Sequence, residues 1–295
     1  MKIVQPTISK IKKHRKELAA LLVVFAITII AQAIAAGTWF EDDIVAVWVF
    51  DVGQGDSIFI DAPEAQILID GGPDGNVIEK LSAVMPFWDR SIDVVINSHP
   101  HADHVTGLVH VLERYFVSEV WWTGQDYGSE VYVYFEDLAQ GSFTLVGAGE
   151  GIDLGAGATL TVLWPESNID NELLDDPNAG SIVALLEYGD STILLTGDVG
   201  TDEELAIVEQ LGEVDVLKVG HQGSMTSSHI YFLEAISPEY SVISVGENDY
   251  GHPSPIVIDR LESVGSTVLR TDLDGDVRIL TDGGEPSVST WLLSP

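Results

Sequence analysis

The segment 94–107 constrains this chain most, because an apolar run leads directly into a dense group of metal-ligating side chains. Four of them fall within six positions where a strand is expected to end: His99, His101, Asp103 and His104. Residues two apart in an extended segment point to the same side. His99 and His101 are therefore placed to bind one ion, and the following turn directs the other two toward a second. Imidazole and carboxylate favour zinc, with iron, manganese or cobalt as alternatives. A solvated histidine-rich turn is disfavoured by the specific H-x-H-x-D-H spacing.

The remainder of the chain alternates short apolar segments with helical patterns. Strands are expected at 44–50, 57–61, 66–70, 92–97, 117–122, 159–164, 182–188, 192–195, 214–219, 240–244, 267–269 and 277–280. Helices are expected at 77–87, 105–115, 202–211, 228–236 and 256–264, whereas 131–139 is ambiguous between helix and strand. Strands in two groups with helices outside them predict an α/β fold, a four-layer αββα sandwich.

Composition narrows the chemistry and the surroundings. Cysteine is absent, so disulfides and thiolate metal sites are excluded and only His, Asp and Glu remain as ligands. The net charge is −34, which repels phosphate at low salt. Molar salt shortens the Debye length to about 3 Å and removes most of that repulsion, which points to a halophilic source or a very saline setting. A hydrophobic content of 45% excludes a disordered acidic chain.

An apolar segment near the N-terminus predicts contact with a membrane. Residues 18–36 contain no charged side chain and, as a helix, would extend roughly 28 Å, enough to cross the hydrocarbon core. Residues 1–17 form a basic leader that is expected to stay in the cytoplasm, so the acidic body is exported. Residues 18–36 act as a transmembrane anchor, or as a signal segment whose cleavage secretes the protein. A buried soluble helix is disfavoured by the flanking charges, and 37–43 is a linker to the folded domain, 44–295.

Three further side chains with charge or proton chemistry follow apolar strands or stand in rigid turns. Asp198 ends the run 191–197, where its two oxygens can bridge two cations about 4 Å apart, although taken alone it also suits a helix N-cap. His252 lies in a Gly-His-Pro loop and is placed to donate a proton to a leaving oxygen or to bind its charge. Lys218 is expected to contact a substrate phosphate. We therefore expect His252 and Lys218 to act with Asp103 in catalysis.

Several motifs together resemble a known family. The segment HPHADH, residues 99–104, looks like the signature of the metallo-β-lactamase superfamily. Four other segments, in the expected order, are similar to the soluble hydrolase domain of ComEC-type DNA-uptake proteins: FDVGQGDS at 50–57, LTGD at 195–198, KVGHQGS at 218–224 and GHPSP at 251–255. The resemblance extends over about 43–282. It implies the αββα fold, metal-dependent hydrolase activity and two divalent ions, with zinc favoured and manganese as the alternative.

The resemblance also assigns ligands. Asp198 corresponds to the carboxylate that bridges the two ions. His221 looks like the last ligand, completing a second site with Asp103, His104 and Asp198. The first site departs from the family, because the histidine that usually completes it is missing between His110 and His221. Asn178 matches that place best, as a ligand or a substrate contact.

Two aspartates are expected behind these ligands. Asp70 corresponds to a residue that holds the metal turn by hydrogen bonds to its amides or imidazoles, although an ordinary turn aspartate is the alternative. Asp56 lies in a Gly-rich turn and is a weaker candidate for such a supporting role, as is Gln54 in the same turn.

The predicted function is metal-assisted hydrolysis by a phosphodiesterase or nuclease. Two ions would lower the pKa of a shared water and hold the hydroxide in line with a phosphodiester. The resemblance implies DNA as the substrate and a DNA-uptake channel as a partner, and smaller nucleotides remain plausible substrates. A lactone or acyl hydrolase with the same metals is the rival enzyme. An anchored binding module with a structural metal is the rival from another class.

Overall fold

The computed structural model describes residues 16–29 and 43–291. The chain divides into two compact units, 1–41 with 82–89 and 42–81 with 90–295. In the first unit, 16–29 is helical. No helix within the described ranges combines the length and the apolar character that crossing a membrane requires. The leader residues 1–15 and most of the predicted linker lie outside the described residues, as do 30–36 of the predicted membrane segment.

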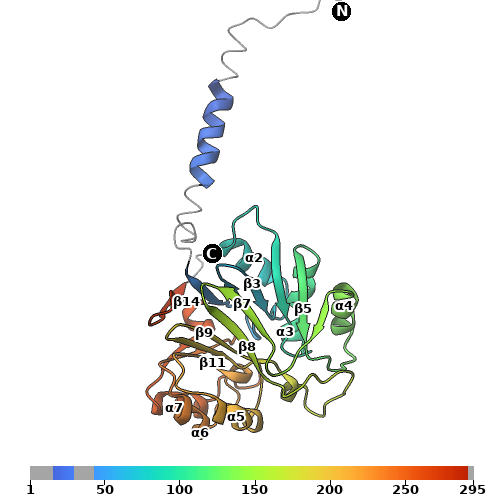
Figure 1. Cartoon of the computed structure of the whole chain (residues 1–295), viewed down its shortest axis with the longest axis vertical. Coiled ribbons are helices and arrows are strands. Elements are labelled where there is room, and N and C mark those ends of the chain that lie inside the picture. The colour runs from blue at the N-terminus through green and yellow to red at the C-terminus, as the bar shows by residue number, and fades with distance from the viewer. Residues whose placement is uncertain (1–15, 30–42, 292–295) are drawn as a thin grey trace, which may run out of the picture. The chain divides into compact units, whose positions relative to one another are not determined.

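The second unit is built on two sheets (Figure 1). In spatial order, the first contains β15 (Ser287–Trp291), β14 (Asp276–Thr281), β1 (Val45–Val49), β2 (Ile58–Asp61), β3 (Gln66–Ile69), β4 (Ser91–Ile96), β5 (Phe116–Trp122) and β6 (Phe143–Leu145). The second contains β13 (Thr267–Arg270), β12 (Tyr240–Ile243), β11 (Val216–Lys218), β10 (Ser191–Leu195), β9 (Val183–Tyr188), β8 (Ala158–Trp164) and β7 (Gly151–Gly155). Both sheets mix parallel and antiparallel pairs.

Helices are interspersed with the strands along the chain. They are α2 (Asn76–Val84), α3 (Ala102–Leu112), α4 (Glu130–Ala139), α5 (Thr201–Ile207), α6 (Ile230–Ile236), α7 (Pro255–Ser263) and α8 (Thr271–Asp274). Short 3-10 turns occur at η1 (Pro177–Gly180), η2 (Val208–Gln210) and η3 (Gly220–Gly223). The ambiguous segment 131–139 is helical, because Ser129 caps α4 by accepting a hydrogen bond from the Tyr132 amide.

The core lies between the two sheets. Alternate residues of each strand point inward, and one apolar cluster contains inward side chains of both sheets, among them Val47, Ile60, Ile193 and Val216. The opposite face of the second sheet packs on α5, α6 and α7 in a separate cluster, and Figure 1 shows α3 and α4 beside the first sheet. The predicted αββα sandwich is confirmed.

Parallel strands deliver the polar side chains to one edge. In the first sheet β3, β4 and β5 run parallel, and in the second β10, β11 and β12 do so. Parallel strands end at the same edge of a sheet. Asp70 follows β3, the histidine cluster follows β4, Asp198 follows β10, and 219–222 follows β11.

A close backbone approach fixes the helix that carries part of the cluster. The Gly107 amide of α3 donates to the Gly72 carbonyl at 3.0 Å, and the Gly71 amide donates to the His104 carbonyl at 2.7 Å. A Cβ on Gly107 would lie 1.8 Å from the Gly71 oxygen, so only glycine is accommodated. The predicted start of this helix at residue 105 was wrong, because α3 begins at Ala102. Asp103 and His104 therefore lie in its first turn.

Candidate metal centre

Asp70 organises the first half of the centre. Its carboxylate is buried and accepts hydrogen bonds from the Ser98 amide at 2.8 Å and the Ser98 hydroxyl at 2.6 Å. The same carboxylate lies 2.8 Å from Nδ1 of His104. Its backbone adopts the left-handed conformation, with φ 57°, which aspartate tolerates better than most residues. Asp70 therefore holds both the turn after β4 and the His104 ring, in the supporting position that the sequence predicts.

The imidazoles crowd together around this turn. Nδ1 of His99 lies 3.0 Å from the Ser98 hydroxyl, which leaves Nε2 directed toward Nδ1 of His101 at 3.1 Å. The His99 and His104 ring centroids are 4.1 Å apart. His99 and His104 are fully buried, whereas His101 is half-buried. Ring nitrogens at this spacing make poor hydrogen bonds with one another, whereas a shared cation would bind to their lone pairs.

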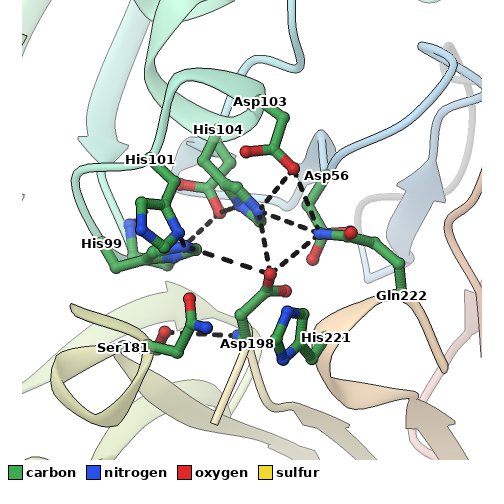
Figure 2. Close-up of polar contacts among 12 residues, drawn as sticks. Asp56, His99, His101, Asp103, His104, Ser181, Asp198, His221 and Gln222 are labelled. Atoms are coloured by element: carbon green, nitrogen blue, oxygen red, sulfur yellow. Dashed lines mark hydrogen bonds and ion pairs between the residues drawn. The ribbon is translucent and has the colours of Figure 1, made fainter. Parts of the chain in front are cut away.

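Asp198 faces these rings from the second sheet, as Figure 2 shows. Its Oδ2 lies 3.3 Å from Nε2 of His104 and 4.0 Å from Nε2 of His99. Its Oδ1 is buried and has no hydrogen-bond partner among the described residues. His99, His104 and Asp198 thus offer one ligand atom each within 4.8 Å of one another. An orphaned carboxylate oxygen beside two nitrogen ligands fits a divalent metal such as zinc.

The protonation of the cluster reflects its burial and mutual charges. Burial disfavours the charge of Asp198, but His104 and His99 hold the pKa of its carboxyl well below the usual range. Burial also opposes charge on His104, yet Asp198 and Asp70 together raise the pKa of His104 well above its ordinary value. Burial and the charge of His104 lower the pKa of His99. Protons and metal ions therefore compete for His104, since a ligand imidazole must be neutral.

Gln222 reaches into the cluster from the turn after β11. Its Nε2 donates to Oδ2 of Asp198 at 2.8 Å and lies 3.1 Å from Nε2 of His104. His221, the predicted last ligand, lies beside Asp198 in Figure 2. Nδ1 of His221 is 3.4 Å from the Thr226 hydroxyl. His221 therefore lies near the centre, but Gln222 is the side chain of this turn that contacts His104 and Asp198.

Two other residues are predicted to act at the centre. The side-chain oxygen of Asn178, in η1, is buried and accepts no hydrogen bond within the described part of the chain, which suits a ligand atom. The His252 ring centroid is 5.5 Å from that of His221. Burial and the charge of His221 lower the pKa of His252. His252 is therefore neutral near pH 7, so hydrogen bonding and proton transfer suit it better than the predicted binding of negative charge.

The expected role of Lys218 was wrong. Its side chain is 1% exposed, and Nζ donates to Oδ2 of Asp56 at 2.6 Å and to the Val219 carbonyl at 2.9 Å. Lys218 ends β11 of the second sheet, and Asp56 precedes β2 of the first, so the ion pair joins the two sheets. A buried ammonium group is held by its carboxylate partner and does not reach a substrate phosphate.

Comparison with known proteins identifies the family. A model of the metallo-β-lactamase superfamily matches residues 50–247. The chain belongs to this superfamily. The matched range includes every ligand predicted from the sequence, from the strand before the histidine cluster to the turn that carries Gln222.

Three curated bacterial proteins are similar to this chain. Recombination protein 2 of Haemophilus influenzae is 29% identical over 92% of this chain and 32% of its own length. Competence protein ComA of Neisseria gonorrhoeae is 30% identical over 78% and 31%. ComE operon protein 3 of Bacillus subtilis is 29% identical over 77% and 32%. The chain therefore spans about a third of each relative, consistent with the ComEC-type resemblance.

Solved structures support the metallo-β-lactamase fold. A diphosphatase of the PhnP family has a TM-score of 0.50 and is 17% identical, covering 80% of this chain and 98% of that one. A mutant of the CmlA beta-hydroxylase has a TM-score of 0.51 and is 15% identical, covering 80% of this chain and 53% of that one. At these identities the likeness concerns the fold alone.

Three polar side chains that contact the centre were not predicted from the sequence. Gln222 received no role, although it stands next to His221 before a glycine at a strand end. Ser98 was likewise overlooked, and its hydroxyl connects Asp70 to His99. The Ser181 hydroxyl oxygen accepts a hydrogen bond from the Asp198 amide at 3.3 Å. The only available signal was their adjacency to predicted ligands or to the strand ends, because a single serine or glutamine carries little chemical information.

Proposed function

We propose that this metallo-β-lactamase superfamily hydrolase is a metal-dependent phosphodiesterase that cleaves DNA. The observation that carries the proposal is the buried carboxylate of Asp198. Its Oδ2 faces the nitrogens of His99 and His104, and its Oδ1 has no hydrogen-bond partner among the described residues. Because a buried carboxylate oxygen without a partner is costly, this arrangement is explained by a cation that the centre is built to bind. His99, His104 and Asp198 would hold it, with zinc favoured by the ligand types.

The bound ion supplies Lewis acidity and lowers the pKa of a water molecule. The chain supplies the orientation. Asp70 fixes the His104 ring through Nδ1, and Ser98 fixes His99 through its own Nδ1. Such hydrogen bonds set the tautomer and the direction of each imidazole.

The surroundings of the centre suit an anionic substrate. The helix α3 begins within the cluster, so the positive end of its dipole lies there and favours a non-bridging phosphate oxygen. His252 is half-buried and its Nδ1 has no hydrogen-bond partner in the described ranges. Because Nδ1 is buried, we expect Nε2 of the neutral ring to exchange a proton with a leaving oxygen.

The choice of DNA rests on the relatives. Two similar proteins carry names that refer to recombination or competence, which suggests a DNA context for them. The net charge of −34 opposes DNA binding at low salt, so we expect activity to increase with salt before screening weakens specific contacts.

We also propose that residues 18–36 anchor the protein with the hydrolase domain outside the cytoplasm, where a DNA-uptake channel is the expected partner. The support is the apolar run with basic residues before it and acidic residues after it. Protease treatment of intact cells tests this arrangement. Digestion of the domain without lysis supports it, and protection until lysis contradicts it.

The substrate experiment uses the full 295-residue chain in molar KCl with Zn²⁺ or Mn²⁺. Single-stranded DNA, duplex DNA, a simple phosphodiester and a lactone are compared, with Asp198→Asn as the matched variant. We expect DNA cleavage that Asp198→Asn abolishes. Turnover of the lactone while the three phosphate substrates stay intact would overturn the substrate assignment. Metal binding without turnover of any substrate would favour a binding module.

A further inference from the structure

The side chain of Gln222 contacts the same three groups to which a second ion was assigned. Its Nε2 lies 2.8 Å from Oδ2 of Asp198, 3.1 Å from Nε2 of His104 and 3.5 Å from Oδ2 of Asp103. Gln222 is 3% exposed. Figure 2 shows its nitrogen at the convergence of the dashed lines from these side chains. An amide group therefore closes a site that the sequence predicts for a cation.

The three atoms that Gln222 contacts have the spacing of cation ligands. Nε2 of His104 is 3.3 Å from Oδ2 of Asp198 and 3.7 Å from Oδ2 of Asp103. Ligands of a tetrahedral zinc ion lie about 3.3 Å apart, given metal–ligand bonds of roughly 2.0 Å. The Gln222 nitrogen stands against all three atoms, where the ion would lie. It is an N–H donor, which carries partial positive charge and has no lone pair to offer a metal.

A hydrogen-bond relay sets which end of the amide faces the centre. The Gly246 amide donates to Oε1 of Gln54 at 3.2 Å, and Nε2 of Gln54 donates to Oε1 of Gln222 at 2.7 Å. A backbone N–H can only donate, so it fixes the orientation of Gln54, and Gln54 in turn fixes that of Gln222. A Cβ on Gly246 would lie 2.5 Å from the backbone nitrogen of Gln54, so the backbones at the start of the relay are tightly packed.

The backbone also favours this placement. His221 and Gln222 both have φ 48°, in the left-handed region that is unfavourable for residues with a Cβ. Two consecutive residues in this conformation direct the Gln222 side chain inward, while His221 is left half-buried beside His252. Strain of this kind persists only where the surrounding structure enforces it.

We propose that Gln222 takes the place of the second ion on the Asp103 side of the centre, so that this chain binds one divalent cation, at His99, His104 and Asp198. The Gln222 amide partly neutralises the facing carboxylates by hydrogen bonding, as a cation would do more strongly. The inference rests on the proposal that the centre binds a metal, and it replaces the two-ion prediction.

The relay allows a test that leaves all the ligands in place. In Gln54→Glu, the new carboxylate still accepts the hydrogen bond from the Gly246 amide. It has no N–H to donate to Gln222, so it can only accept a hydrogen bond from Gln222. The Gln222 amide must then turn, and its oxygen faces Asp103, His104 and Asp198 as a ligand. Gln222→His provides a ligand without adding negative charge, which separates coordination from simple charge attraction.

The measurement is metal stoichiometry on the full chain, by equilibrium dialysis against Zn²⁺ with elemental analysis. We expect one ion per wild-type chain and two in both variants, with the affinity for the second ion raised at least 10-fold. Electron paramagnetic resonance of the Mn²⁺-loaded protein provides a second readout, with isolated Mn²⁺ signals for the wild type and spin-coupled pairs for the variants.

The possible failures are distinguishable. Two ions in the wild type with affinities within 10-fold of each other would overturn the single-ion inference and leave the hydrolase proposal standing. No bound ion in the wild type would instead remove the proposed metal function itself. Because the wild-type result decides between these outcomes, the inference stays testable even where a variant fails to fold.

Discussion

Asp198 and Asp56 are both buried carboxylates near strand ends of the sandwich, yet their surroundings differ. Asp56 pairs with the Lys218 ammonium at 2.6 Å inside the protein. Asp198 contacts imidazole and amide groups instead. In both residues Oδ1 is buried and has no hydrogen-bond partner within the described residues. Asp56 is therefore neutralised by an ammonium group of the chain, whereas Asp198 is surrounded by side chains that can act as metal ligands or hydrogen-bond donors.

The pKa values reflect this difference. Burial raises the pKa of Asp56 to about 6, even though Lys218 opposes the shift. Burial likewise disfavours charge on Asp198, but His104 and His99 hold its pKa well below the usual range. A carboxylate kept ionised by neighbouring imidazoles is typical of a functional site, whereas a closed ion pair with a lysine between two sheets is typical of a structural one.

The largest expected effect comes from Asp198→Asn. An amide cannot replace a carboxylate as a charged metal ligand, so hydrolysis of DNA should fall at least about 10⁴-fold as the activation of water is lost. Initial rates with Zn²⁺, together with zinc affinity from a chelator competition, measure the change. A variant that keeps wild-type zinc affinity would show that Asp198 is structural, like Asp56.

The next largest effect is expected from Lys218→Met. This change leaves Asp56 as a buried carboxylate without its cation, and breaking such a pair costs about 3–5 kcal/mol of the free energy of unfolding. Urea unfolding at pH 7 measures it. The double variant Lys218→Met with Asp56→Leu should recover most of the loss, since no buried charge remains. A cost below about 1 kcal/mol for the single variant would contradict the structural role.

A third buried carboxylate sharpens the comparison by a pH dependence. Glu204 accepts from the Ser228 amide at 2.6 Å and the His229 amide at 2.9 Å, and burial raises its pKa to about 7. The folded state therefore binds this proton more tightly than the unfolded state does. The stabilisation is complete below pH 4.5, the ordinary value, and is lost as the pH rises to about 7. The loss amounts to about 3 kcal/mol.

Unfolding by urea at several pH values checks this sign. In Glu204→Gln the decline in the free energy of unfolding between about pH 4.5 and 7 should be smaller than in the wild type, because the titrating group is gone. Parallel curves for the two proteins would show that Glu204 ionises normally.

The smallest effect is expected from Asp70→Asn. The amide has one acceptor oxygen where Asp70 has two, so it cannot hold both Ser98 and the His104 ring. Substitution of such a supporting residue lowers metal affinity about 10- to 100-fold. Zinc competition measures the loss, with Asp190→Asn, at an exposed turn, as the unchanged control. An unaltered affinity would place Asp70 with Asp56 among purely structural carboxylates.

Local pattern was enough to predict most of the fold and the principal side chains of the centre. The strands that carry them are continuous apolar runs, so their ends were visible, and Asp70, His99 and Asp198 each follow such an end. The boundary of α3 was harder to predict. Its start at Ala102 depends on the close approach of Gly107 to Gly71, a contact between separate elements that periodicity does not encode.

The sequence by itself determined the chemistry of the centre, because imidazole and carboxylate side chains at successive strand ends suit a metal wherever those strands meet. Tertiary structure alone decided how the other polar groups are used. Lys218 pairs with Asp56 across 162 residues, and Gln54 orients Gln222 across 168. Both contacts depend on how the two sheets pack face to face. A buried charge or amide takes whatever partner that packing brings within hydrogen-bond reach.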